Sequence, residues 1–412
     1  MNVSAKLSAL FVFLAALSSP LSTSAFGQGS LTPPGAPAPT MQTLDQLGAK
    51  LSQTGTKLDQ TEPRIPIESL PITITQSGSY YFTKNLRFTA ASGTAILVQA
   101  SDVTIDLMGF TLSSDAAVNS IAINLSGNGC TVRNGSIVGA TTISMAGSGA
   151  SKTWTKTAAG FSFGIFAVGS GHRFIDLTIA RCRDVGLSTG NDNVVARCIA
   201  YQNGGAGLSA GTISDSIAFE NAGDGISTGQ NIGGVVSASR AYNNKGDGFS
   251  AVIVANCTST SNGGRGFDVM QANHCIASFN VGDGISAISA ALGCTARGNG
   301  GHGISIGRLA KDNECDGNGA AGIRFSADGA RIEGNNCKDN QWGIQSAAGS
   351  NGFIVRNSCR SNSGTPTNPG ASGNYDFDRA TNTYGPVEIV NGDIAAGANA
   401  ARESNAWANI QY

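Results

Sequence analysis

The sequence predicts an all-β protein, a single-stranded right-handed parallel β-helix (β-solenoid) of about 13 coils with N- and C-terminal caps. Three observations predict it. Asn recurs at intervals of 18 to 23 residues, and a Gly followed by a large apolar residue recurs with the same period. The segments between them are short and alternate apolar with small polar residues, which favours strands over helices. The Asn column is Asn203, Asn221, Asn244, Asn262, Asn280, Asn299, Asn318, Asn340 and Asn362.

Each recurring residue has a physical task in such a coil. Parallel coils stack in register at ~4.8 Å, so equivalent positions lie directly above one another. Asn tolerates the left-handed backbone of a tight turn, and its amide can bond the Asn above and below. The Gly opens the next strand, and the apolar residue after it points into the core. The repeated phrases are therefore scaffolding.

Cysteines occupy a small interior position of the repeat. Cys198, Cys257, Cys275 and Cys294 alternate there with Ser. Side chains stacked in register point the same way rather than at each other, so we predict unbridged buried thiols, with disulfides as the alternative.

Composition and patterning divide the chain into five parts. Residues 1–25 resemble a secretory signal peptide, 26–66 form a Pro-rich linker and a short helical segment, and 67–90 form cap strands. The β-helix covers 91–365 with a projecting loop at 140–160, and 366–412 form the C-terminal cap. A signal peptide implies a secreted, periplasmic or cell-surface protein, and no later stretch has the ~20 apolar residues of a membrane span. The segment 41–62 is a candidate for homo-oligomerisation, with a loosely docked helix as the alternative.

The charge balance argues against nucleic acid as a partner. The chain carries 26 basic and 27 acidic residues, and only 13% of its residues are charged. Binding to a phosphate backbone requires a basic surface, and none is encoded here.

One column of the repeat is charged at its centre. Two residues before each apolar residue, successive coils carry Asp224, Asp247, Arg265, Asp283 and His302. Stacking predicts that these side chains are neighbours, which makes the three Asp and His302 candidate catalytic residues and Arg265 a candidate substrate-binding residue. Asp224 and Asp247 are also candidate metal ligands, since Ca²⁺ would be the cofactor if the protein were a lyase; otherwise no cofactor is expected. The alternative is a ladder of charges that keeps the coils soluble and in register.

The insertion at 140–160 carries Trp154 between Lys152 and Lys156. An exposed Trp flanked by two cations can stack on a sugar ring and attract an acidic polysaccharide. The alternative is that Trp154 folds back onto the coils.

The coils, together with VTIDLMGFTL at 103–112 and CTVRNGSIVG at 130–139, resemble secreted bacterial β-helix proteins of the pectate-lyase-like superfold. That superfold includes lyases, hydrolases, epimerases and non-enzymatic adhesins, so the resemblance implies the fold and leaves the activity open.

The stretch GHGISIG at 301–307 is similar to the Gly-His-Gly motif of polygalacturonase-type glycoside hydrolases. The resemblance implies that His302 and Asp283 are site residues and that Arg324 is the later substrate-binding cation. The sequence departs from the pattern at Gly282 and Arg265, where that family carries carboxylates. Two of its catalytic groups are therefore missing.

The sequence thus predicts an exported carbohydrate-directed protein that binds an acidic polysaccharide and, if the charged column is catalytic, cleaves it as a hydrolase or lyase. The alternative is a non-catalytic structural or adhesive β-helix at the cell surface.

Overall fold

The computed structural model describes residues 44–61, 63–115, 120–147, 151–228, 233–365, 373–377, 382–385, 387–389 and 408–411. The chain divides into two compact units, 1–63 and 64–412. In the first unit the described element is helix α2 (Leu44–Thr61), on which Leu44, Leu47 and Leu51 are exposed. The predicted signal peptide, the Pro-rich linker and most of the C-terminal cap lie outside the described residues.

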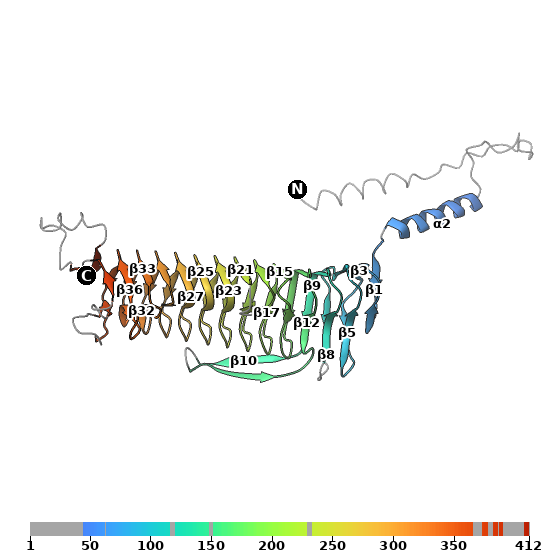
Figure 1. Cartoon of the computed structure of the whole chain (residues 1–412). Helices are drawn as coiled ribbons and strands as arrows, with labels where there is room; N and C mark the ends of the chain where they lie inside the picture. The colour runs from blue at the N-terminus through green and yellow to red at the C-terminus, as the bar shows by residue number, and fades with distance from the viewer. Residues whose placement is uncertain are drawn as a thin grey trace, which may run out of the picture. The chain divides into compact units, whose positions relative to one another are not determined.

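The second unit is a parallel β-helix of about 13 coils, which confirms the predicted fold class. Figure 1 shows the strands of successive coils stacked side by side along one axis. Each coil contributes strands to three stacks, and within each stack the neighbouring strands are parallel.

The first stack carries the Gly–apolar step of the repeat. Its strands are β2 (Ile72–Ile74), β5 (Gly93–Val98), β8 (Ser120–Leu125), β12 (Phe163–Ala167), β14 (Leu187–Thr189), β17 (Leu208–Ser209), β20 (Ile226–Ser227), β23 (Phe249–Ala255), β25 (Phe267–Asn273), β27 (Ile285–Leu292), β29 (Ile304–Ile306), β32 (Ala321–Phe325), β35 (Trp342–Ser346) and β38 (Tyr375–Asp376).

The second stack follows it along each coil, and the long strands β23, β25 and β27 run through both. Its other strands are β1 (Ile65–Ile67), β3 (Gly78–Phe82), β6 (Val103–Asp106), β9 (Thr131–Val138), β13 (Arg173–Ala180), β15 (Val194–Ala196), β18 (Thr212–Ser214), β21 (Val235–Ser237), β30 (Leu309–Lys311), β33 (Ala330–Glu333), β36 (Gly352–Val355) and β39 (Thr383–Tyr384).

The third stack precedes the Asn turn, and β9 and β13 extend into it. Its other strands are β4 (Leu86–Arg87), β7 (Thr111–Ser113), β16 (Ile199–Tyr201), β19 (Ile217–Phe219), β22 (Arg240–Tyr242), β24 (Thr258–Thr260), β26 (Ile276–Ser278), β28 (Thr295–Arg297), β31 (Glu314–Asp316), β34 (Asn336–Lys338), β37 (Ser358–Arg360), β41 (Asn409–Gln411) and β40 (Val387–Ile389).

The predicted loop at 140–160 contains a two-stranded antiparallel hairpin, β10 (Thr142–Ala146) and β11 (Thr153–Thr157). The hairpin runs alongside the coils in Figure 1.

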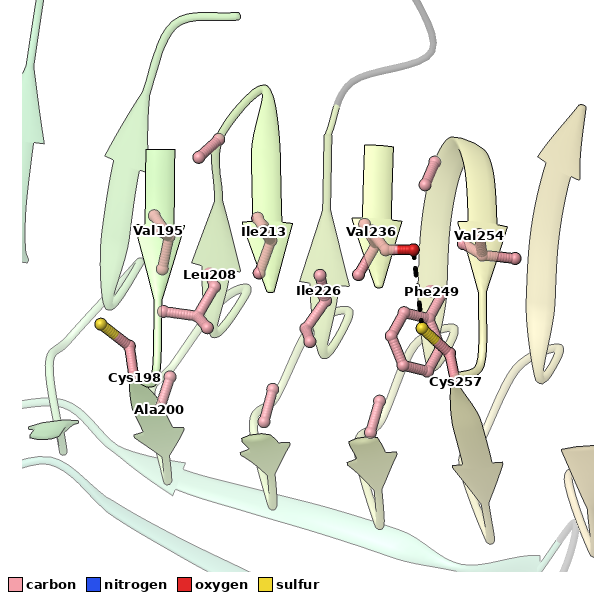
Figure 2. Packing of buried hydrophobic residues seen from close by; sticks show 14 of the residues in the cluster. Val195, Cys198, Ala200, Leu208, Ile213, Ile226, Val236, Phe249, Val254 and Cys257 are labelled. Carbon is pink, nitrogen blue, oxygen red and sulfur yellow. Dashed lines mark hydrogen bonds between the residues drawn. The ribbon is translucent and has the colours of Figure 1, made fainter. Parts of the chain in front are cut away.

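The core consists of rows of like residues inside the coils. Val195, Ile213, Val236 and Val254 form one row, and Leu208, Ile226 and Phe249 face them from the first stack (Figure 2). All seven side chains are fully buried. Burying each such side chain contributes roughly 1.5–3 kcal/mol, so the rows are a main source of stability.

The predicted Asn ladder is present and continuous. Between Asn203 and Asn374, each Asn of the column donates its Nδ2–H to the Oδ1 of the Asn one coil further on, as Asn244 does to Asn262 at 3.0 Å. That same Oδ1 also accepts the backbone N–H of Asn244 at 3.0 Å. Each amide thus joins two coils through both the side chain and the backbone.

A second ladder, which the sequence analysis missed, begins where the first Cys column ends. It consists of Asn313, Asn335, Asn357 and Asn409, and the Oδ1 of Asn313 accepts the backbone N–H of Cys294 at 2.8 Å. Cys and Asn therefore fill the same interior turn position in different coils.

All nine cysteines are buried and unbridged. Cys315, Cys337 and Cys359 lie in a column of their own, because Cys315 is in register with Ala296 of the preceding coil. Both columns face the interior, as predicted. Burial raises the pKa of the Cys182 and Cys198 thiols to about 12, which leaves them protonated at neutral pH.

We therefore predict that the native protein reacts little with a thiol reagent at neutral pH, because all nine thiols are buried and structural buried cysteines are inert. After denaturation without reductant, titration should recover the nine thiols of the sequence. Recovery of one thiol or none would instead demonstrate disulfides.

Candidate functional site

The charged edge, defined as Asp224, Asp247, Arg265, Asp283 and His302, stacks along successive coils as predicted. Each Asp carboxylate receives a backbone N–H from the next coil. Asp224 Oδ1 accepts from the Asp247 N–H at 2.8 Å, Asp247 Oδ1 from the Arg265 N–H at 2.6 Å, and Asp283 Oδ1 from the His302 N–H at 2.7 Å. These side chains therefore lie along the stacking direction and join the coils.

The glycines on the two sides of this column are each required because a side chain there would collide with a different neighbour. A Cβ at Gly301 would meet the Oδ1 of Asp283 from the preceding coil. A Cβ at Gly284 would lie 2.6 Å from the Nδ2 of Asn299 and 2.6 Å from the carbonyl oxygen of Gly303. The Gly-x-Gly step thus makes room for the Asp column on one side and for the Asn ladder on the other.

Basic residues of the charged edge have partners within the β-helix. The Arg265 guanidinium turns to Asp268, with 2.9 Å between Nη1 and Oδ1. His302 Nδ1 accepts the backbone N–H of Ala321 at 3.1 Å, an arrangement that places the ring proton on Nε2. Arg324, half-buried in β32, is in register with Ser305 of the preceding coil.

Burial dominates the electrostatics of this edge. It raises the pKa of Asp224 and of Asp247 above the usual range, although the hydrogen bond from the next coil's N–H opposes the shift in each case. Burial also lowers the pKa of His302, against the opposing effect of Asp283. The edge thus combines carboxylates that resist ionisation with an imidazole that resists protonation.

The donor set at Asp224 and Asp247 does not fit Ca²⁺. That ion takes six to eight oxygen ligands, whereas one oxygen of each carboxylate is already hydrogen-bonded to a backbone N–H. Within the described parts of the chain, no group of three or more His, Cys, Asp and Glu side chains is placed to hold a metal ion.

The hairpin is attached to the coils by its lysines. Lys152 Nζ donates to Asn243 Oδ1 at 3.3 Å and lies 5.7 Å from the ring centroid of Trp154, which is half-buried. Lys156 Nζ donates to the Gly204 carbonyl oxygen at 3.1 Å and lies 3.7 Å from Asp184 Oδ1. Both lysines predicted to bind substrate thus also anchor the hairpin.

A cavity of about 550 Å³ lies between the hairpin and the Asn turns of later coils. We call it the hairpin cleft. Its lining includes Lys152 from the hairpin and Asn243, Ser261, Phe279 and Val281 from the turns. The lining contains no residue of the charged edge and not Trp154, so the structure separates the predicted catalytic residues from the hairpin cleft.

Phe279 is the unusual residue of this cleft. It occupies the left-handed position directly before the ladder Asn, with φ 58°, and its side chain is 59% exposed. The same position in neighbouring coils holds polar residues or glycine: Gln202, Glu220, Asn243, Ser261, Gly298 and Gly317. A bulky apolar residue with positive φ is strained, and such strain is concentrated at functional sites.

The Phe279 ring lies against the next coil, because a Cβ at Gly298 would be 2.7 Å from its Cε1. Phe279 was not predicted as a site residue. The sequence does distinguish it, since it is the one apolar residue in a column that otherwise holds polar residues or glycine between positions 202 and 317.

Comparisons with known proteins find only solved structures of low sequence identity. A scan against protein-family models and a search of curated proteins give no match. Among solved structures, the chain is similar to the A-module of the mannuronan C-5 epimerase AlgE4 of Azotobacter vinelandii, with 14% identity and a TM-score of 0.43 over 68% of this chain and 86% of that one.

A mutant of the periplasmic alginate epimerase AlgG shows 14% identity and a TM-score of 0.43, over 71% of this chain and 76% of that one. The catalytic domain of a GH87 α-1,3-glucanase shows 12% identity and a TM-score of 0.39, over 86% of this chain and 69% of that one. At these identities and TM-scores the likenesses do not assign a function to this chain. Where the chain is described, it has no helix both long and apolar enough to span a bilayer.

The charged edge generates a prediction about stability and pH. Because the folded state raises the pKa of Asp247, its stabilising contribution is present below the unfolded pKa and is lost as pH rises through the folded value. Asp247→Asn keeps an acceptor for the Arg265 N–H and removes the half-buried charge. We expect the variant to be more stable than the wild type at pH 7, by less than about 1 kcal/mol because solvent still screens this half-buried group.

Denaturant unfolding at pH 7 and below pH about 4 provides the measurement, and the difference should shrink at the lower pH. Asp247→Ala is the matched control, since it removes the acceptor and should destabilise the protein at both pH values. An Asn variant that is clearly less stable than the wild type at pH 7 would contradict this account.

Proposed function

We propose that this protein binds a polysaccharide and that the hairpin cleft is the binding surface. The observation that carries the proposal is Phe279, an exposed ring held in a strained turn position at the wall of a cavity of about 550 Å³. Neither its turn nor the core needs an aromatic side chain there. A ligand that covers the ring would compensate for the strain.

The other lining groups suit a sugar. Carbohydrates combine apolar C–H faces, which stack on aromatic rings, with hydroxyl groups, which need polar partners. Asn243 and Ser261 supply an amide and a hydroxyl beside the ring, and Lys152 supplies a cation. The cleft thus offers one apolar platform and several directional polar groups, as ligand sites usually do.

We assign binding rather than cleavage to this protein. Glycoside hydrolysis by two carboxylates requires one that donates a proton and one that acts as base or nucleophile. The three Asp residues of the charged edge each accept a backbone N–H from the next coil, and position 282, where the similar hydrolases carry a carboxylate, is Gly. The proposal includes export, which the resemblance of residues 1–25 to a signal peptide supports, and a preference for acidic chains, which Lys152 supports.

The first prediction for this site is that Phe279→Asn abolishes or strongly weakens binding while leaving the protein at least as stable. Asn tolerates the left-handed conformation and already occupies the equivalent position at Asn243. Loss of a stacking contact of about 1–3 kcal/mol should weaken affinity at least several-fold. Isothermal titration with oligosaccharides from pectin and alginate, together with thermal unfolding, measures both effects.

Ile288→Ala is the matched control, because Ile288 is an exposed apolar residue outside the hairpin cleft. It should bind like the wild type. If Phe279→Asn bound equally well, the cleft would not be the site, and if the wild type bound no glycan, the structural β-helix would be the better account.

The second prediction concerns the charged edge. Asp283→Asn should leave oligosaccharide affinity unchanged, since Asn can still accept the His302 N–H and the side chain lies outside the cleft. Wild type and variant should release neither reducing ends nor unsaturated products from these polymers. Turnover by the wild type that disappears in the variant would restore the catalytic interpretation.

A further inference from the structure

Three aromatic side chains form a stack on the outer face of the third strand stack, and the stack ends at Tyr242. Tyr201 and Phe219 have ring centroids 5.0 Å apart with planes 7° apart, and Phe219 and Tyr242 are 5.0 Å apart with planes 3° apart. Phe219 covers one face of the Tyr242 ring. On the other side, the residue in register is Thr260, which is too small to cover the second face.

A hollow of about 220 Å³ lies at this step from Tyr to Thr. Its lining includes Arg240, Tyr242, Thr258 and Thr260. It shares Asn243 and Ser261 with the hairpin cleft, so the two cavities adjoin.

Arg240 gives the hollow a charge. Its side chain is exposed, and no hydrogen bond or ion pair joins it to another described residue. Each of the hollow's other side chains is uncharged: an aromatic ring, hydroxyl groups, an amide and the methyl group of Ala241. A guanidinium beside a bare ring face fits a ligand that has an apolar face and a carboxylate on the same unit, because Arg binds carboxylates through two parallel N–H donors.

We propose that this hollow is a subsite for one carboxylated sugar residue, which stacks on Tyr242 and pairs its carboxylate with Arg240. The inference rests on the proposed glycan-binding function and narrows the ligand to a uronate-containing chain. Phe279 lies two coils further on, roughly 10 Å along the axis at ~4.8 Å per coil. A glycan that reaches from Tyr242 to Phe279 therefore runs parallel to the coil axis, beneath the hairpin.

The test compares two probes that differ only in charge: oligogalacturonates of defined length and their methyl esters, with oligomannuronates and their esters as a second series. In the series that binds, isothermal titration should show that the wild type prefers the free acid by about tenfold, the effect of one charge-assisted hydrogen-bonded pair. Arg240→Gln should reduce the preference to the part that Lys152 contributes and leave affinity for the ester unchanged. Added salt should weaken the preference in the wild type.

Two variants of Tyr242 separate the contribution of ring stacking from that of the carboxylate–Arg240 pair. Tyr242→Ala should weaken both the acid and the ester, whereas Tyr242→Phe should weaken neither, because the phenyl ring still stacks. Arg308→Gln is the matched control, since it removes an exposed arginine that lines neither cavity and should keep the preference.

The outcomes are distinct. A reduced preference in Arg240→Gln, with the preference kept in Arg308→Gln, supports the subsite. A wild type that binds acid and ester equally, or an Arg240→Gln variant that prefers the acid as strongly as the wild type does, overturns the subsite and leaves glycan binding in place. A wild type that binds neither probe overturns the proposed function, and the subsite with it.

Discussion

The Asn ladder fixes the register of the coils from Asn203 onward, and with it the positions of the side chains that those coils carry on their surface. The Oδ1 of Asn280 accepts both the backbone N–H of Asn262, at 3.1 Å, and its Nδ2–H, at 3.0 Å. Because these groups are buried, a coil that slipped by one residue would leave several donors and acceptors unpaired, at about 1–3 kcal/mol for each. Register is therefore kept although the spacing of the ladder varies from 18 to 23 residues between Asn203 and Asn362. Side chains at equivalent positions remain stacked along the whole axis.

Two surface features follow from this constraint and differ in kind. At the charged edge, Asp side chains repeat on the outside what Asn does inside, since each accepts a backbone N–H from the next coil. The raised pKa values of Asp224 and Asp247 are a consequence of burial in that arrangement. Around the hairpin, by contrast, Phe279 is the apolar exception in a column of polar residues and glycine, and Tyr242 ends the aromatic stack with one ring face left uncovered. In a repeat, a residue that departs from its column without serving the scaffold is the better candidate for function.

The sequence predicted the repeat, its strand stacks, the Asn ladder and the stacking of the charged column, because a fixed period translates directly into register. It could not predict that the Asp carboxylates would be occupied by backbone N–H groups, since that depends on side-chain rotamers. It also could not place Lys152 and Lys156, because an insertion escapes the repeat and its path is decided by tertiary contacts such as those to Asn243 and Gly204. The role of Tyr242 was not predicted for a related reason, because it depends on the small side chain of Thr260, in register on the next coil, which leaves one ring face uncovered.

The most direct test of the account is a crystal structure of the protein with a bound oligouronate. The account predicts a glycan that lies between the hairpin and the Asn turns, parallel to the coil axis, with sugar rings against Phe279 and Tyr242 and a carboxylate at Arg240. A glycan bound along the charged edge from Asp224 to His302, with the hairpin cleft empty, would contradict it.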